Sequence, residues 1–212
     1  MGESRGIFRF MEFLNWLVQL AYVQLLWGLF TLLGVGIVGL FPATNAMYSI
    51  IRKWLSGNTD VPVFSFMWNT YKKEFIKSNL YFYSFVLIGM IFYFYFKLFQ
   101  SQESLLHAIL TIVLFIVLIF YCIGFMIAIP IYAHFDLKLR SFYKMTLYTI
   151  FSFPFHMITI IVIHVLFYLL ISYIPGLAPF ISFSILAFAV TVIMRLVFTK
   201  MDEKQIVVEQ GN

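Results

Sequence analysis

The sequence predicts an all-α, polytopic membrane protein with about five transmembrane helices and with amphipathic interfacial helices between the first two. The 212 residues are 63% hydrophobic and only 11% charged, whereas soluble domains average about 25% charged residues. Apolar runs of about 18 residues or more recur along the chain, which is long enough for helices that cross a bilayer. These runs are apolar on every face, which indicates helices rather than the alternating strands of a barrel.

The first span is expected at residues 16–40. It begins at Trp16, and the polar residues Gln19 and Gln24 lie inside it. Polar side chains within a span usually form hydrogen bonds to a neighbouring helix, and they also line polar paths. The sequence leaves both uses open, and it leaves open whether this span is single or re-entrant.

Three glycines near the end of this span, Gly34, Gly36 and Gly39, form the pattern GxGxxG. In dinucleotide-binding proteins the pattern follows a strand and opens a helix. Here it ends an apolar segment instead. We therefore expect the glycines to allow close helix packing or a flexible exit from the membrane, and we predict no cofactor.

Residues 42–78 are expected to form two amphipathic blocks on the membrane surface. Pro42 suits the first turn of a helix, where its missing N–H has no partner to lose. Met47, Ile50 and Trp54 then recur at helical spacing. Lysine and arginine attract anionic lipid, and aromatic residues with arginine often dominate protein interfaces. We therefore expect contacts with lipid or a partner protein from Arg52, Lys53, Trp54, Trp68, Tyr71, Lys72, Lys73 and Lys77.

Four further apolar segments follow this basic stretch. The spans are expected at residues 79–99, 108–133, 145–172 and 180–199, and an exposed, partly disordered tail at residues 200–212. Pro154 is expected to kink the fourth span. His164 lies near the middle of that span and joins Gln19 and Gln24 as a candidate intramembrane polar residue.

The basic residues predict the orientation. Five spans place the two termini on opposite sides of the membrane, and the side richer in Lys and Arg is usually cytoplasmic. We therefore predict a plasma-membrane protein with its N-terminus outside and its C-terminus in the cytoplasm. The cytoplasmic side would hold Arg52, Lys53, Lys72, Lys73, Lys77, Lys138, Arg140, Lys144, Arg195, Lys200 and Lys204, and the outer side Arg5, Arg9 and Lys97.

Several kinds of chemistry lack a signature in the sequence. There is no GxxxxGK[ST], HExxH or GxSxG pattern, and Cys122 is the single cysteine. The histidines include no pair at helical i, i+4 spacing, and the acidic residues all fall outside the centres of the expected spans. We predict neither a metal site nor an enzyme, and no self-powered ion-coupled transporter. Because the basic residues flank the spans, we also predict no nucleic-acid binding.

The stretch from residue 39 to residue 75 resembles the YesL family of bacterial integral membrane proteins. The resemblance is carried by GLFPATNAMYSIIRKWLSGNTDVPVFSFMWNTYKKEF. It implies a bacterial plasma-membrane protein of a family without assigned chemistry, whose members are often encoded beside solute-binding and permease components of carbohydrate ABC importers. It implies no catalytic residue.

Two functional hypotheses follow. The first is an accessory or regulatory membrane subunit of a carbohydrate ABC import system, which docks on permease or ATPase subunits through its basic cytoplasmic face. The alternative is a small channel or facilitator, alone or as an oligomer, lined by Gln19, Gln24 and His164. Besides the lipid bilayer, the sequence leaves a homo-oligomer open as a further partner.

Overall fold

Helices make up nearly all of the regular structure. The computed structural model describes the backbone of residues 2–100 and 104–210, and the side chains of residues 10–12, 14–100 and 104–202. No strand occurs among these residues. The elements, in order, are α1 (Gly2–Leu33), α2 (Ile37–Leu55), α3 (Val63–Gln100), α4 (Leu105–His134), α5 (Leu139–Ser152), α6 (Pro154–Tyr173), the 3-10 turn η1 (Pro175–Leu177) and α7 (Ala178–Gln210).

Five helical segments in the described residues are long and apolar enough to cross a membrane. They are Phe10–Leu33, Val63–Gln100, Leu105–His134, Pro154–Tyr173 and Pro175–Asp202. This confirms the predicted fold class, a polytopic α-helical membrane protein. The boundaries differ from the predicted spans at several places, each for an identifiable reason.

The predicted first span is divided at its glycines, because α1 ends at Leu33 and α2 begins at Ile37. Gly36 adopts a φ of 71°, which side chains with a Cβ rarely tolerate. A Cβ built on Gly34 would lie 2.2 Å from the Gly39 Cα atom. The glycines therefore serve a tight turn between closely packed helices, in line with the packing role expected from the sequence.

The prediction that Pro42 starts a helix was wrong, because α2 begins at Ile37 and contains Pro42 in its interior. A proline there leaves the carbonyl four residues earlier, that of Val38, without its usual N–H partner. The Asn79 side chain on α3 supplies the missing donor, with Nδ2 2.9 Å from the Val38 carbonyl oxygen. A contact from a neighbouring helix thus compensates for the proline.

Residues 42–78 do not form two separate surface helices. The first part belongs to α2, which contacts α1, α3, α4 and α7 and buries Met47, Ile50 and Trp54. Its polar face is also covered, since Asn45 and Ser49 are buried. The second part is the beginning of α3, which continues without a break into the predicted second span. The amphipathic pattern was correctly located, but the polar face of α2 is largely covered and does not lie open on the surface.

The predicted fourth span, 145–172, is also divided. Residues 139–152 form the separate helix α5, and α6 begins at Pro154. Phe153 between them has φ −131° and ψ 53°, outside the α region, because a following proline disfavours helical geometry. At the C-terminus, α7 continues through the predicted tail to Gln210, while residues 211 and 212 lie outside the described residues.

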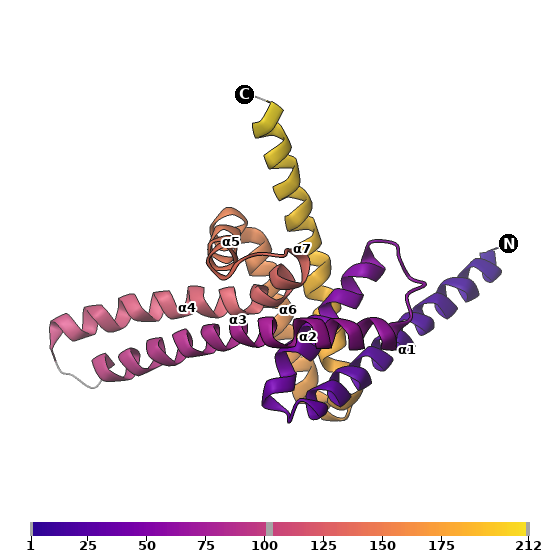
Figure 1. Cartoon of the computed structure of the whole chain (residues 1–212), viewed down its shortest axis with the longest axis horizontal. Helices are drawn as coiled ribbons and strands as arrows, with labels where there is room; N and C mark the ends of the chain where they lie inside the picture. Colours follow the sequence, from indigo (N-terminus) through magenta and orange to yellow (C-terminus); the bar gives the residue numbers. More distant parts are fainter. Residues whose placement is uncertain (1, 101–103, 211–212) are drawn as a thin grey trace.

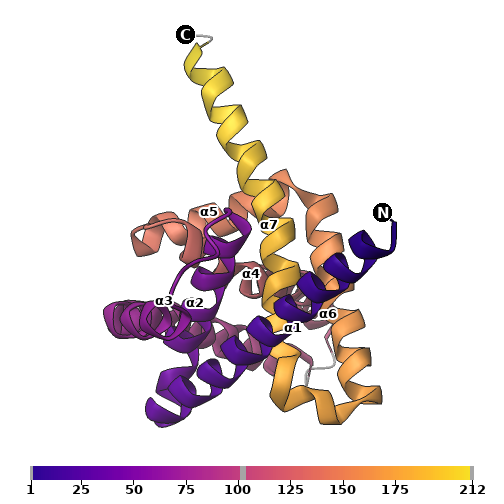
Figure 2. The same cartoon turned by 90° about the vertical axis from the view of Figure 1, so that its right-hand side faces the viewer.

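The α3–α4 hairpin projects from the other helices (Figure 1). In the view turned by 90°, α3 is seen end-on while α6 and α7 run up the picture (Figure 2), so the hairpin lies across these two helices. Its outer part exposes large apolar side chains, including Met90, Phe94, Leu105 and Ile112. Such a surface is typical of helices that contact lipid or another protein.

Candidate functional site

A polar cleft lies where α2, the first turns of α3 and the end of α4 meet. Its volume is about 420 Å³, which is within the usual range for small-molecule sites, roughly 300–1,000 Å³. We call it the basic cleft. Its polar lining comprises Asn45, Ser49, Arg52 and Lys53 from α2, Asn69, Thr70, Lys73, Glu74 and Lys77 from α3, Tyr132 and His134 from α4, and Asp136 from the following loop.

Arg52 lines the basic cleft and also connects two of the helices that form it, α2 and α4. Its Nη1 atom donates a hydrogen bond to the carbonyl oxygen of His134, the last residue of α4, at 2.9 Å. Arg195 on α7 donates in the same way to the carbonyl of Leu55, the last residue of α2. A cation at a helix C-terminus satisfies free carbonyls and interacts favourably with the helix dipole. The two arginines thus link the ends of α2 and α4 to their neighbours.

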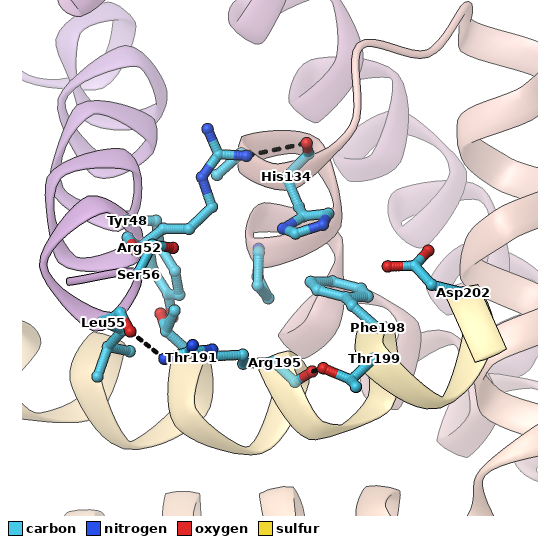
Figure 3. Close-up of a pocket in the computed structure, with 12 residues that line it drawn as sticks. Tyr48, Arg52, Leu55, Ser56, His134, Thr191, Arg195, Phe198, Thr199 and Asp202 are labelled. Atoms are coloured by element: carbon cyan, nitrogen blue, oxygen red, sulfur yellow. Dashed lines mark hydrogen bonds between the residues drawn. The ribbon is translucent and has the colours of Figure 1, made fainter. Parts of the chain in front are cut away.

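A second, smaller cavity of about 130 Å³ adjoins the basic cleft. Tyr48, Arg195 and Asp202 contribute to its lining, and Arg52 and His134 line both cavities. Figure 3 shows one terminal nitrogen of Arg52 at the His134 carbonyl and the other pointing away from the smaller cavity. Arg52 therefore stands between the two cavities.

The charges of the basic cleft are only partly compensated. Lys77 forms an ion pair with Asp136, and this contact holds the pKa of the Asp136 carboxyl below its usual range. Glu74 accepts a hydrogen bond from the Tyr132 hydroxyl at 2.8 Å. Among the side chains that the structure describes, Lys77 and Asp136 form the only ion pair within 4.0 Å. Arg52, Lys53 and Lys73 thus have no carboxylate partner there.

A different face of α3 carries a row of side chains four residues apart, which places them on one side of the helix. Phe64 is 47% exposed and Ile76 is 82% exposed. Between them, Lys72 places its Nζ atom 5.1 Å from the centre of the half-buried Trp68 ring. We call Phe64, Trp68, Lys72 and Ile76 the outer stripe. None of these four residues lines the basic cleft.

The structure divides the eight residues that the sequence singled out on residues 42–78. Arg52, Lys53, Lys73 and Lys77 line the basic cleft, whereas Trp68 and Lys72 belong to the outer stripe. Two do not fit a surface role. Trp54 is buried with its ring 5.7 Å from that of Trp16, and Tyr71 is buried with its ring 5.4 Å from that of Phe30. Their aromatic side chains fill the core between helices.

The three intramembrane polar candidates are not gathered at one hydrogen-bonded site. Gln24 is buried, and its Oε1 atom accepts a hydrogen bond from the backbone N–H of Ser184 on α7 at 3.0 Å. His164 lies with Nδ1 2.8 Å from the carbonyl oxygen of Ile160, one turn earlier in α6. Gln19 is half-buried. For Gln24, this is the helix-bonding use that the sequence left open.

Sequence reasoning missed the importance of Asn45, Asn79 and Asp136. Asn45 and Ser49 lie on the polar side of the amphipathic block, and both are buried beside the basic cleft. A signal for Asn79 existed, because a polar residue next to a long apolar run often bonds another helix. Its partner, the Val38 carbonyl, could be identified only from the three-dimensional arrangement.

The fold and the cleft define a helical membrane protein with a polar cavity, and sequence comparison places it in a family. The family model described as "Protein of unknown function, DUF624" matches residues 20–96, which include α2 and nearly all of α3. The chain belongs to this family. The resemblance to YesL found in the sequence is thereby confirmed.

Three relatives from Bacillus subtilis (strain 168) are similar to this chain. "Uncharacterized protein YteU" is 34% identical over 203 residues, covering 96% of this chain and 91% of the relative. "Uncharacterized protein YesL" is 29% identical, covering 92% and 91%. "Uncharacterized protein YesV" is 38% identical over 125 residues, covering 59% and 60%. No solved structure matches this chain.

Proposed function

We propose that this protein is an accessory or regulatory membrane subunit of a bacterial carbohydrate ABC import system. It sits in the plasma membrane with its N-terminus outside and its C-terminus in the cytoplasm. It docks on the permease or ATPase subunits through the cytoplasmic end of α3. The observation that carries the proposal is the outer stripe, in which aromatic, apolar and cationic side chains are exposed together.

The composition of the outer stripe favours a protein partner. Aromatic residues are enriched at the centres of interfaces, where a few of them supply most of the binding energy. Trp68 is half-buried and therefore held in place, while Lys72 covers its ring and Ile76 stands out from the surface. A pre-organised aromatic residue loses little conformational freedom on binding.

Contacts among the basic residues support the proposed orientation. The end of α2 and the starts of α3 and α5 carry most of the residues assigned to the cytoplasmic side. Arg52 contacts α4, Arg195 contacts α2, and Lys77 pairs with Asp136 beyond α4. These contacts bring basic residues of α2, α3 and α7 together around the C-terminal ends of α2 and α4. Lys97, assigned to the outer side, lies near the opposite end of α3. The Arg5, Arg9 and Lys204 side chains lie outside the described ones.

The choice of a carbohydrate importer as partner rests on the family resemblance, since related members are often encoded beside such importers. The competing explanation of the outer stripe is attraction to anionic lipid, worth about 1 kcal/mol per Lys or Arg near the surface. The two explanations predict different neighbours for Ile76, a protein subunit or only lipid.

Site-specific photo-cross-linking in native membranes tests the proposal. A photoreactive residue at Ile76 should yield an adduct with a permease or ATPase subunit, identified by mass spectrometry. The same residue at Leu105, which is 79% exposed near the far end of the α3–α4 hairpin, is the matched control. Replacing Trp68 with Ala and Lys72 with Glu should remove the Ile76 adduct and lower solute uptake. Adducts with lipid or a second copy alone, with unchanged uptake, would refute it.

The alternative function is a stand-alone or oligomeric channel or facilitator. Gln24 is hydrogen-bonded to α7 and His164 to its own helix, which does not favour their use as a polar lining. Solute flux into liposomes that contain only this protein would support the alternative. It would be weakened by flux no faster than in empty liposomes for several solutes.

A further inference from the structure

We propose that the basic cleft binds a ligand that carries an oxyanion, a phosphate or a carboxylate, together with a hydroxyl group. The oxyanion would contact Arg52, Lys53 and Lys73, and the hydroxyl group would contact Asn45. The oxyanion belongs either to a small soluble molecule or to the headgroup of a lipid, and the two sources are separable by experiment.

The basic cleft carries an excess of positive charge. The lining of the basic cleft holds four cationic and two anionic side chains. Lys77 and Asp136 neutralise each other, and Glu74 is hydrogen-bonded to Tyr132. Arg52 donates one hydrogen bond to a neutral carbonyl, that of His134. An arginine has five N–H donors, so its charge is not neutralised and other donors remain. The remaining donors, with Lys53 and Lys73, leave an excess of positive charge that a phosphate or carboxylate would satisfy.

The lining of the basic cleft also includes a residue with an unpartnered polar atom. Asn45 is only 2% exposed, and its Oδ1 atom has no hydrogen-bond partner among the described residues. A buried acceptor without a donor is unfavourable by about 1–3 kcal/mol, so a bound group that donates to it removes this cost. An amide oxygen accepts but does not donate. The ligand group that satisfies the Asn45 Oδ1 atom must therefore be a hydrogen-bond donor, such as a hydroxyl. An oxyanion alone has no such donor.

The basic cleft lies next to the apolar part of α3. The cleft is lined on the α3 side by residues 66–77, and the long apolar part of α3 begins directly afterwards. In the orientation proposed above, this cavity lies at the depth of the lipid headgroups. It is therefore accessible to a headgroup from the bilayer and to a solute from the aqueous side. Its volume of about 420 Å³ accommodates either.

This inference is separate from the docking proposal because it uses another face of α3. Lys73 lines the cleft and has an exposed side chain, whereas its neighbour Lys72 covers Trp68 on the outer stripe. The two lysines therefore provide a matched pair: the same change of charge, one residue apart, inside and outside the proposed site. Substitution of Lys72 should weaken binding of the protein partner, whereas substitution of Lys73 should weaken binding of the ligand. The two effects can be told apart.

The test uses the full chain purified in an uncharged detergent. Isothermal titration with inorganic phosphate and with glycerol 3-phosphate probes a soluble ligand, and the second molecule adds hydroxyl groups. Nanodiscs of phosphatidylcholine with or without phosphatidylglycerol probe a headgroup, read out by lipids retained in native mass spectrometry. We expect one of these arms to show saturable binding. Replacing Lys53 and Lys73 with Gln should weaken that binding about tenfold, while Lys72→Gln should leave it unchanged.

Asn45→Leu should remove any preference for glycerol 3-phosphate over inorganic phosphate and leave phosphate binding in place. Binding in the soluble arm only identifies a solute site, and binding in the lipid arm only identifies a headgroup site. Absence of binding in both arms would overturn the proposal. Equal weakening by Lys72→Gln and Lys73→Gln would also overturn it, because it would indicate general attraction of anions to a basic surface. The Lys73 variant changes an exposed side chain, so loss of folding does not confuse its result.

Discussion

The compensation between Pro42 and Asn79 can be tested by a double-mutant cycle. The Val38 carbonyl loses its helical donor to the proline and gains the Asn79 Nδ2 atom at 2.9 Å. Replacing Asn79 with Leu therefore leaves a partly buried carbonyl without a donor, which costs about 1–3 kcal/mol. The substitution also removes the Oδ1 atom of Asn79, which has no partner among the described residues. The expected net loss in free energy of unfolding is therefore about 1–2 kcal/mol.

The second arm of the cycle is Pro42→Ala. Alanine restores an N–H at position 42, which can bond the Val38 carbonyl within the helix. In that background we expect Asn79→Leu to cost less than about 0.5 kcal/mol. The coupling between the two positions is then about 1 kcal/mol, a value that arises only if both serve the same carbonyl.

The assay is reversible unfolding in mixed micelles with increasing sodium dodecyl sulfate, followed by far-UV circular dichroism and tryptophan fluorescence. Gly28→Ala serves as the control, because a Cβ there meets no atom within 4 Å. Its effect on the free energy of unfolding should therefore be the same with and without Pro42. An equal cost of Asn79→Leu with and without Pro42 would refute the reasoning. It would mean that Asn79 stabilises the protein through its other bond, to the Phe75 carbonyl.

Three further predictions concern packing, an interhelical bond and pH. Gly39→Ala places its Cβ 2.4 Å from a backbone carbonyl of α1, so we expect a loss above about 3 kcal/mol and little folded protein on size-exclusion chromatography, unlike Gly28→Ala. Gln24→Leu should lower the free energy of unfolding by about 0.6 kcal/mol, the average for interhelical bonds in a membrane protein, measured in the same mixed micelles. Lys77 lowers the pKa of Asp136, so the pair stabilises the folded state fully above the ordinary carboxyl pKa and loses this effect as the pH falls through the lowered pKa. Thermal unfolding from pH 6 to pH 3 should show a smaller acid-induced drop for Asp136→Asn than for the wild type.

Much of the fold could be predicted because hydrophobicity in a membrane protein reports directly on helices. Uninterrupted apolar runs and their number correctly gave the class and the five candidate spans. The boundaries at Leu33 and at Phe153 were missed. At the first, a tight glycine turn breaks an apolar run, and at the second, a proline starts a new helix instead of bending an old one. Neither break contains a charged residue, so hydropathy gives little sign of them.

The sequence identified the basic residues of the candidate site but not the surfaces that they face. The basic residues of residues 42–78 were identified, but periodicity cannot say whether a polar helix face meets water or another polar surface. The polar face of α2 borders the basic cleft. The end of α4 lies across this face, where Arg52 donates to the His134 carbonyl. Trp54 and Tyr71 illustrate the opposite error, since aromatic residues at a predicted membrane surface are equally suited to filling the space between helices.

The continuity of α3 joins two environments in one rigid element. Its 38 residues correspond to a rod about 57 Å long, whose first turns border the basic cleft and carry the outer stripe, and whose remainder forms one arm of the apolar hairpin. Since no hinge separates these parts, a tilt of the arm within the bilayer must swing the polar end by a matching amount. Whatever occupies the cleft or rests on the stripe is thus mechanically connected to the position of the hairpin in its surroundings.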